Sequence, residues 1–432
     1  MQLSPRHIFA EDWPQHVGVL RMSVTRSRTS VSYLWREPRA AQDFTTGVSL
    51  HSHTNQSHET LDSIAELSTD FKVLQPVMRW LEGRCLRFSG IQPDYARSYW
   101  TPPLTPRLAL DLERRQVEDA LELPGLVSIT DHDNIHAPLL LRTVASARHL
   151  PISLEWSMPY ANPAAVAEQR PTAFHLGIHN LPAASAAEWM TRLNAFTALS
   201  VETRPAAALL ALLAELHGLP GVLIVFNHPL WDLYRIGLEK HRVLVNDFLA
   251  THGQFLHALE LNGLRDWTEN RAVQVLAVQW NQVVISGGDR HGIEPNANLN
   301  LTQATSFDEF VSEVRGERIS HVLFMPQYKQ PWKHRILQST LDAIRDYPDF
   351  PEGSRRWDGR AYHPNAAGEL QALSSLWDCG RAGPPPVYLS VLLNAVRLLG
   401  APPVSGGLRL AWKHANRNDV GSMRAALAES DV

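Results

Sequence analysis

The stretch Gly47-Val48-Ser49-Leu50-His51-Ser52-His53-Thr54 joins a short apolar run to two histidines two positions apart. On an extended strand, residues i and i+2 face the same side, so the imidazoles of His51 and His53 can point at one metal ion. The alternative is a polar pair on the exposed face of an amphipathic strand. The pair alone does not decide between these interpretations, so the other apolar runs have to be considered.

The same arrangement, an apolar run that ends in a side chain able to bind metal, recurs along the chain. Charged and imidazole groups crowded at a strand end would be costly in a core, so a metal site or an open cleft explains them better. For Glu155 a buried salt bridge remains the alternative. The further runs are 126–129 before Asp131-His132-Asp133, 151–154 before Glu155, 173–174 before His175, 221–226 before Asn227-His228-Pro229, and 282–286 before Asp289-Arg290-His291.

These strand ends together supply a set of candidate metal ligands, with His58 as an additional member. Nitrogen and oxygen ligands without thiolate favour zinc, manganese or iron, and the set is larger than one ion needs. We therefore expect a centre of two or three divalent ions. The candidate ligands are His51, His53, His132, Glu155, His175, His228, Asp289 and His291.

Amphipathic stretches over 184–197, 205–217 and 243–252 lie between the apolar runs, with apolar residues at about every third or fourth position. Alternating β and α units predict an α/β fold with a mostly parallel sheet, open or closed. In such folds the functional groups gather at the carboxyl ends of the strands. The candidate ligands follow their strands and therefore fit this placement.

Composition narrows the class of protein. The 432 residues are 44% hydrophobic and carry a formal net charge of -4, which indicates a folded chain without a broad positive field for nucleic acid. The two cysteines, Cys85 and Cys379, are far apart and form no thiolate zinc motif. Because the start lacks a signal-peptide pattern and no run approaches the ~20 apolar residues of a membrane span, we expect a cytoplasmic protein without membrane association.

The order of the motifs resembles that of the PHP (polymerase and histidinol phosphatase) family. The chain has His-x-His-Thr at 51–54, Thr-Asp-His at 130–132, an isolated Glu155, an isolated His175, His-Pro at 228–229 and Gly-x-Asp-x-His at 287–291. The resemblance spans 47–325 and implies a distorted (β/α)7, TIM-like barrel with a trinuclear metal centre at the carboxyl ends of its strands.

The resemblance also implies roles for single residues. The eight candidate ligands correspond to metal ligands of the family, with Glu155 as a bridging carboxylate. His58 lies where the family usually has Asp or His, seven or eight residues after the first histidine, and so is a candidate ligand or proton donor. Asp131 resembles a carboxylate that orients a neighbouring imidazole.

The rest of the chain departs from a minimal domain. Residues 1–46 are predicted to be a small β extension, with β-prone runs at 17–20 and 31–35. An aromatic and proline-rich insertion at about 64–106 is expected to lie over the site, because long loops in compact domains tend to be lids or binding loops. Residues 326–432 are predicted to be a mostly helical extension that includes a buried helix at 386–399.

Several residues remain open alternatives. His179 competes with His175 for one ligand role, and His175 is preferred because the family's histidine precedes an apolar run. Arg290 alternates away from Asp289 and His291, so Arg265 is the better candidate for a phosphate clamp, with a solvated surface arginine as the alternative. Glu260 follows an apolar run and is a candidate pocket residue or part of a turn. The remaining histidines considered, expected to be structural or exposed, are His136, His252, His257 and His363.

The leading hypothesis for function is hydrolysis of a small-molecule phosphomonoester. A metal-bound hydroxide would attack phosphorus in line, with Asp289, His228 or His58 assisting proton transfer. A nuclease or phosphodiesterase acting on nucleic-acid ends is an alternative that the acidic balance disfavours. A non-catalytic, metal-stabilised scaffold is a second alternative, although structural sites are normally closed by four ligands. Substrate identity, metal identity and oligomeric state do not follow from the sequence.

Overall fold

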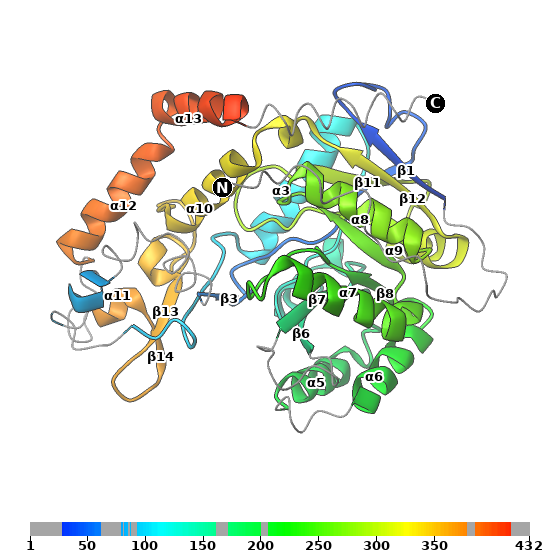
Figure 1. The fold of residues 1–432 in the computed structure, drawn as a ribbon, viewed down its shortest axis with the longest axis horizontal. Coiled ribbons are helices and arrows are strands. Elements are labelled where there is room, and N and C mark those ends of the chain that lie inside the picture. The colour runs from blue at the N-terminus through cyan, green and yellow to red at the C-terminus, as the bar shows by residue number, and fades with distance from the viewer. Residues whose placement is uncertain are drawn as a thin grey trace, which may run out of the picture.

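The computed structural model describes residues 28–61, 79–80, 82–84, 87, 93–160, 172–199, 206–377 and 385–415. Their strands form two five-stranded sheets and one four-stranded sheet. The two larger sheets and the helices around them make up the main body, and the four-stranded sheet lies beside it with the C-terminal helices (Figure 1).

The first five-stranded sheet has the strand order β1-β12-β11-β2-β5. β1 is parallel to β12 and β2 is parallel to β5, whereas β11 is antiparallel to both of its neighbours. The strands are β1 (Arg28–Tyr33), β2 (Thr46–Ser49), β5 (Gly125–Val127), β11 (Asn298–Thr302) and β12 (Ile319–Phe324).

The second five-stranded sheet has the order β10-β9-β8-β7-β6. β8, β9 and β10 are parallel to one another, and β7 is antiparallel to both β6 and β8. Each of these strands contains or adjoins an apolar run that the sequence singled out. Their bounds are β6 (Leu154–Tyr160), β7 (Thr172–His179), β8 (Leu223–Phe226), β9 (Ala258–Asn262) and β10 (Val283–Gly287).

The predicted (β/α)7 barrel is wrong for the described part of the chain. The strands of the main body form two mixed sheets, with β7 and β11 antiparallel to their neighbours, and no closed barrel is present among the described strands. The apolar pattern of a strand reports which residues are buried, but not the direction of the strand that pairs with it. Strand existence was therefore predictable here, whereas strand direction was not.

Helices cover the sheets at several of the predicted places. The amphipathic stretches 184–197, 205–217 and 243–252 correspond to α5, α6 and α7, so these helix predictions are confirmed. The main helices are α3 (Pro106–Leu121), α4 (His136–Leu141), α5 (Ala186–Thr197), α6 (Ala206–Gly218), α7 (Leu238–His252), α8 (Trp267–Gln279) and α9 (Phe307–Ser312). Shorter helical turns are η1 (Ala145–Ala147), η4 (Gly253–Phe255), η5 (Glu313–Glu317), η6 (Pro326–Lys329) and η7 (Trp357–Gly359).

Helix α3 holds the strand that leads into the first histidine motif. The Thr105 side chain accepts a hydrogen bond from the Leu108 N–H, and Pro106 occupies the first turn, two features that favour a helix start here. A Cβ on Gly47 would lie 2.5 Å from the Val117 side chain, so only glycine lets α3 approach β2 this closely. This close packing fixes the position of β2 next to the site.

The core lies on both faces of the second sheet. One cluster joins Leu176, Phe226 and Leu259 of that sheet to helix residues such as Leu213 and Phe248. A second cluster contains residues of both large sheets, so one face of each sheet packs against the other. Its strand members are Val48, Leu223, Val225, Ala258, Val283 and Ile285.

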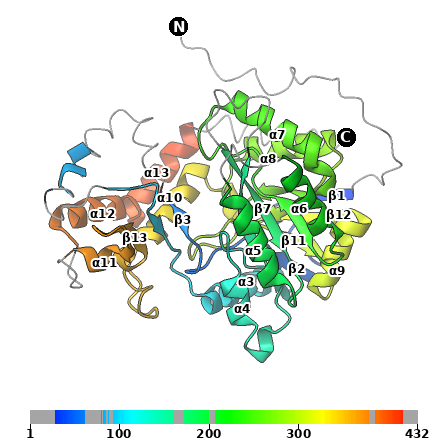
Figure 2. The same cartoon turned by 90° about the horizontal axis from the view of Figure 1, so that it is seen from below.

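The C-terminal segment is joined to the region after the first motif by the four-stranded sheet, ordered β14-β13-β4-β3. In Figures 1 and 2 its helices lie to one side of the main body, with α10 nearest to it. The predicted domain boundaries stay predictions. The elements are β3 (Glu59–Thr60), β4 (Tyr99–Trp100), α10 (Trp332–Ile344), β13 (Ala361–Pro364), β14 (Leu370–Ala372), α11 (Leu373–Leu376), α12 (Val387–Leu399) and α13 (Pro402–Ala415).

Two further predictions concern the C-terminal and N-terminal regions of the chain. The helix at 386–399 is confirmed as α12, but its predicted burial is wrong, because Val387 is 80% exposed and Val391 is 64% exposed. Apolar composition predicted a core helix, yet α12 lies to one side of the main body, where fewer elements surround it. In the N-terminal region, β1 contains most of the run at 31–35, and the run at 17–20 lies outside the described residues.

Within the described ranges, no single helix is long and apolar enough to cross a membrane. The pair formed by α12 and Pro402–Lys413 passes by length and composition, but is bent by 61°.

Candidate metal centre

The first histidine motif lies where the two large sheets meet. Ser52 forms an isolated parallel bridge with Arg290, and His132 forms another with Glu155. The Gly288 N–H also donates to the Leu50 carbonyl at 3.0 Å. The ends of β2 and β10, and those of β5 and β6, are thereby held side by side, which brings four separate sequence motifs to one place.

The backbone at this seam is unusual. His51, His228 and Asp289 have φ angles of 63°, 26° and 53°, in the left-handed region that residues other than glycine rarely adopt. His51 and His53 both reach Glu155, but His51 does so through this bend rather than on the extended strand that we expected. Such conformations cost free energy and are found most often at functional sites.

Glu155 is the carboxylate with the most imidazole neighbours. Its side chain is fully buried on β6, and it also accepts a hydrogen bond from the Asn227 amide at 2.9 Å. Every imidazole around it belongs to the predicted ligand set. The nitrogen–oxygen distances are 3.0 Å to His51, 3.4 Å to His53, 3.3 Å to His132, 3.2 Å to His175 and 3.2 Å to His228.

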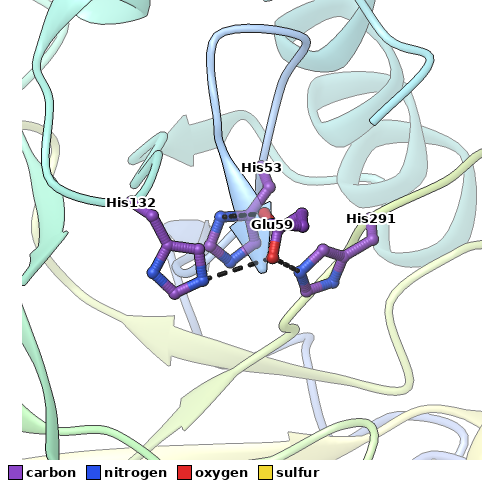
Figure 3. A group of neighbouring side chains, drawn as sticks. All are labelled: His53, Glu59, His132 and His291. Atoms are coloured by element: carbon purple, nitrogen blue, oxygen red, sulfur yellow. Dashed lines mark ion pairs between the residues drawn. The ribbon is translucent and has the colours of Figure 1, made fainter. Parts of the chain in front are cut away.

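Glu59 is a second carboxylate of the site, and the sequence analysis missed it. Its oxygens lie 3.6 Å from His53 Nδ1, 3.3 Å from His132 Nε2 and 3.2 Å from His291 Nε2, and Figure 3 shows the three imidazoles around it. A signal existed, because Glu59 stands eight residues after His51 (59 − 51), within the spacing used to select His58. The sequence pointed to His58 because the family that the motifs resemble usually has Asp or His at this spacing.

His58 lies outside the four groups of possible ligands found among the described residues. Its ring stacks on Tyr99 with centroids 4.1 Å apart, and burial lowers its pKa. It does line the cavity beside these groups. Its role as a ligand stays a prediction, and its position is that of a side chain next to the centre.

Asp289 and His291 approach the cluster from the end of β10. Asp289 Oδ1 is 3.5 Å from His51 Nε2, 3.7 Å from His53 Nε2 and 3.5 Å from His291 Nδ1. Arg290 points elsewhere, as predicted, and its guanidinium lies 3.2 Å from the buried carboxylate of Glu113.

Two further carboxylates stabilise this arrangement. Glu260 Oε1 is 2.6 Å from His51 Nδ1, and its other oxygen accepts the His228 N–H at 2.8 Å. Asp131 accepts hydrogen bonds from the Thr54 N–H and hydroxyl at 2.6 and 2.8 Å. Glu260 therefore orients the His51 imidazole, whereas Asp131, which we expected to orient a neighbouring imidazole, is hydrogen-bonded to Thr54 in the loop of the first motif. Carboxylates of the Glu260 kind orient imidazole ligands in metal sites.

The alternative between His175 and His179 has a geometric answer. Both lie on β7, but His175 Nδ1 is 3.2 Å from Glu155, whereas His179 Nδ1 is 2.8 Å from the Ser128 hydroxyl. Four residues on a strand span roughly 13 Å at about 3.3 Å per residue, too far for both to serve one ion. His175 belongs to one of the groups of possible ligands, and His179 to none of those found among the described residues.

The buried carboxylates and imidazoles of the candidate centre shift one another's pKa values. Burial alone would raise the pKa of Glu155, but His51, His175 and His132 hold that pKa well below its usual range. Burial likewise opposes a charged His132, yet Glu59 and Glu155 raise its pKa to about 10, and Glu59 raises that of His291 to about 9. The carboxylates therefore need positive charge beside them, and a divalent cation supplies such charge.

The side chains present fit metal ions. Four overlapping groups each place their ligand atoms within 4.8 Å of one another, and Glu155, His51, His53 and His132 each belong to two of them. Beyond their ion-pair contacts with Glu155 and Asp289, the buried atoms His53 Nε2 and His175 Nδ1 have no hydrogen-bond partner in the part of the chain that the structure describes. The donor set is imidazole nitrogen and carboxylate oxygen, suited to zinc, manganese or iron.

A cavity of about 310 Å³ opens onto these groups. Glu155, His132 and Asp289 lie in its wall, together with Trp100 and Arg265. Arg265 is only 8% exposed, and its guanidinium lies 4.0 Å from the ring centre of Trp231. A buried cation thus faces the same space as the candidate ligands. The alternative of a solvated surface arginine is therefore wrong.

The histidines expected to be structural or exposed lie apart from these groups. His136 is exposed, and His257 accepts the Ile224 N–H at 2.9 Å. His252 is buried against Phe248, and His363 accepts the Asp94 N–H at 2.9 Å. These four side chains have structural or surface positions.

Comparison with known proteins adds little to this site. No protein-family model matches the chain, and no curated protein matches its sequence. A solved amidohydrolase from Chromobacterium violaceum, with bound sulfate and no metal, is 14% identical over 56% of this chain and 87% of that one, with a TM-score of 0.31. A structure described as a metal-dependent phosphoesterase from Bifidobacterium adolescentis is 15% identical over 62% and 95%, with a TM-score of 0.29. Likenesses this low carry no argument about the present chain.

Proposed function

We propose that this chain hydrolyses phosphomonoesters of small molecules with two or three divalent ions held by the candidate metal centre. The observation that carries the proposal is the sharing of Glu155 between overlapping imidazole groups, in the wall of a cavity that also contains the buried cation Arg265. Overlapping groups hold ions close together, and close ion pairs are typical of phosphoryl-transfer sites. The reaction class also follows the motif order that resembles the PHP family.

Each ion is assigned to a different group of candidate ligands. His53, Glu59, His132 and His291 would hold one ion, and the groups around Glu155 and Asp289 would hold the others. Ions bound there would supply positive charge for the phosphoryl oxygens and would lower the pKa of the attacking water. Glu260 keeps His51 in place for this role through its 2.6 Å contact.

Substrate binding is assigned to Arg265. Its guanidinium rests on the Trp231 ring, 4.0 Å from the ring centre, which restricts its motion, and its Nε has no hydrogen-bond partner among the described residues. Arginine binds phosphate oxygens through paired N–H donors. The cavity of about 310 Å³ suits a small molecule rather than a nucleic-acid strand.

Proton transfer is assigned to three candidate residues of the cavity wall. Asp289 offers a carboxylate oxygen to the proton of the attacking water, with His228 on the same wall as the second candidate. As the bond between phosphorus and the leaving oxygen breaks, His58 in its protonated, imidazolium form would donate a proton to that oxygen. His58 is free for this because it lies outside the four ligand groups found among the described residues.

The test combines metal analysis with phosphate release. We expect two or three ions per chain and release of phosphate from small phosphomonoesters, with both lost in the variant His51→Ala/His53→Ala. His149→Ala, at an exposed histidine, is the matched control and should change neither. Near-zero metal and no release after addition of manganese or zinc would contradict the proposal. Bound metal without phosphate release would instead favour the scaffold. The cytoplasmic location predicted from the sequence belongs to the same proposal and is tested by cell fractionation.

A further inference from the structure

A second cavity of about 330 Å³ lies directly beside the metal centre. The two cavities share Leu264, Asp289, His291 and Ser339 in their walls. Most of the rest of the second cavity is lined by the segment after β10 and by helix α10 of the C-terminal segment, with Gly263, Gln327 and Gln330 completing it. A molecule with its phosphate at the metal centre would therefore meet this space with its other end.

Buried polar atoms in the wall of this cavity have no partner. Asn296, His334 and Arg335 are 3%, 7% and 8% exposed, and all three line the cavity. Asn296 Oδ1, His334 Nδ1 and Arg335 Nε make no hydrogen bond to any residue that the structure describes. Unpaired buried polar groups cost free energy and are rare in folded proteins, so several in one cavity wall indicate a polar ligand.

The orientations of these groups are fixed by their other contacts. Asn296 Nδ2 donates to the Ser49 hydroxyl at 2.9 Å and also to Glu113, which leaves Oδ1 as a free acceptor. The terminal nitrogens of Arg335 donate to the carbonyls of Gly263 and Arg265, which leaves Nε as a free donor. These polar side chains of the cavity wall are therefore held in fixed positions before a ligand binds.

Two more acceptors complete the set. Glu294 Oε1 and Gln327 Oε1 also line the cavity and lack a hydrogen-bond partner among the described residues. Acceptors thus outnumber donors, and a ligand that fits them has to donate several hydrogen bonds while accepting a few. Hydroxyl groups do both, whereas alkyl and aryl groups do neither.

We propose that this second cavity binds the leaving group of the substrate and selects a small polyhydroxylated alcohol, such as a sugar or polyol. The inference rests on the proposed function, because it takes the phosphate to lie at the metal centre. It assigns helix α10 a part in substrate selection. A site built to pair with hydroxyl groups rejects analogues that lack them, because its own buried polar groups would then stay unpaired.

The test uses three substrates that differ only in the leaving group: ribose 5-phosphate, tetrahydrofurfuryl phosphate, which keeps the ring without its hydroxyls, and methyl phosphate. We expect kcat/KM for ribose 5-phosphate to exceed that for tetrahydrofurfuryl phosphate by at least roughly tenfold, the scale of one or more lost hydrogen bonds. Comparable values for the two would overturn the proposal while leaving the hydrolase intact.

Two variants locate the effect. Gln338→Trp fills the second cavity from α10 and should lower kcat/KM for ribose 5-phosphate while leaving methyl phosphate unchanged. Thr340→Trp, on the exposed side of the same helix, is the matched control and should change neither. Gln327→Leu removes one acceptor without filling the space and should reduce the preference between the two ring substrates. An unchanged preference in both Gln338→Trp and Gln327→Leu would overturn the proposal.

Calorimetry separates this inference from the proposed function. Ribose 5-phosphate and tetrahydrofurfuryl phosphate are titrated into the purified protein, with binding measured independently of turnover. Tighter binding of ribose 5-phosphate that Gln338→Trp removes supports the cavity assignment even if no phosphate is released. Equal affinities overturn it. Release of phosphate from none of the three substrates would count against the proposed function alone.

Discussion

Glu155 and Glu59 are the two carboxylates around which the imidazoles gather, and they reach the site in different ways. Glu155 is part of β6 in a large sheet, directly after an apolar run, and contacts five imidazoles. Glu59 is part of the two-residue strand β3 in the small sheet and contacts three. The position of Glu155 was predictable from local sequence. The position of Glu59 depends on strand pairing, because β3 pairs with β4, and β4 pairs with β13 of the C-terminal segment. One carboxylate of the candidate centre is therefore positioned by a large sheet, and the other by the four-stranded sheet that includes the C-terminal segment.

The largest effect is expected for Glu155→Gln. Glu155 belongs to two of the four ligand groups, so neutralising it weakens both. We expect metal affinity to fall by more than about 100-fold, the upper end seen for outer carboxylates that only orient ligands. Elemental analysis after dialysis measures this, with Glu118→Gln on the exposed side of α3 as the matched control. Full retention of metal by the variant would show that Glu155 is not a shared metal ligand.

Glu59→Gln should have a smaller and more selective effect. Glu59 belongs to one ligand group, and the groups around Glu155 do not include it. We therefore expect the variant to bind one ion fewer per chain than the wild type and to keep the others. The ion count in the same dialysis experiment decides this. A loss as large as that of Glu155→Gln would show that the two sides of the centre do not act separately.

Glu260→Gln tests the carboxylate that orients His51 and His228, two of the imidazoles around Glu155. Its two oxygens accept from the His51 ring and from the His228 N–H, and a glutamine can accept at only one of these positions. We expect metal affinity to fall roughly 10–100-fold, as for other outer partners of imidazole ligands. A competition titration with a chelator measures the change. An affinity equal to that of the wild type would mean that His51 holds its orientation without Glu260.

The smallest effect on metal content is expected for His58→Phe. Phenylalanine keeps the stack on Tyr99 but has no ring nitrogen. We expect the ion count to stay unchanged while kcat for poor leaving groups falls about 100-fold or more, as for loss of a general acid. Substrates with an acidic phenol as leaving group should lose much less. Loss of an ion would instead make His58 a ligand and would weaken the contrast with Glu59.

Local sequence located most of the candidate ligands, because an apolar run followed by His, Asp or Glu places a strand and its end within a few residues. His51, His132, His228 and Asp289 follow β2, β5, β8 and β10 as predicted, whereas Glu155 lies at the start of β6 rather than after a strand, and the structure brings all five together. The helices α5, α6 and α7 were also predictable, since each has an apolar stripe at helical spacing. Burial of α12 was predicted from the same kind of pattern and was wrong, because composition does not tell which neighbours a helix will have.

The sequence alone indicated the chemical types of the candidate ligands and most of their positions, because both follow from short-range patterns of apolar and polar residues. Tertiary structure decided the strand directions, and with them two mixed sheets in place of the predicted barrel. It also decided which carboxylate holds His51, that Glu59 rather than His58 joins the imidazoles, and that α10 lines a second cavity. Each of these features depends on contacts between segments far apart in the chain, which form only when the two large sheets, the four-stranded sheet and the C-terminal helices pack together.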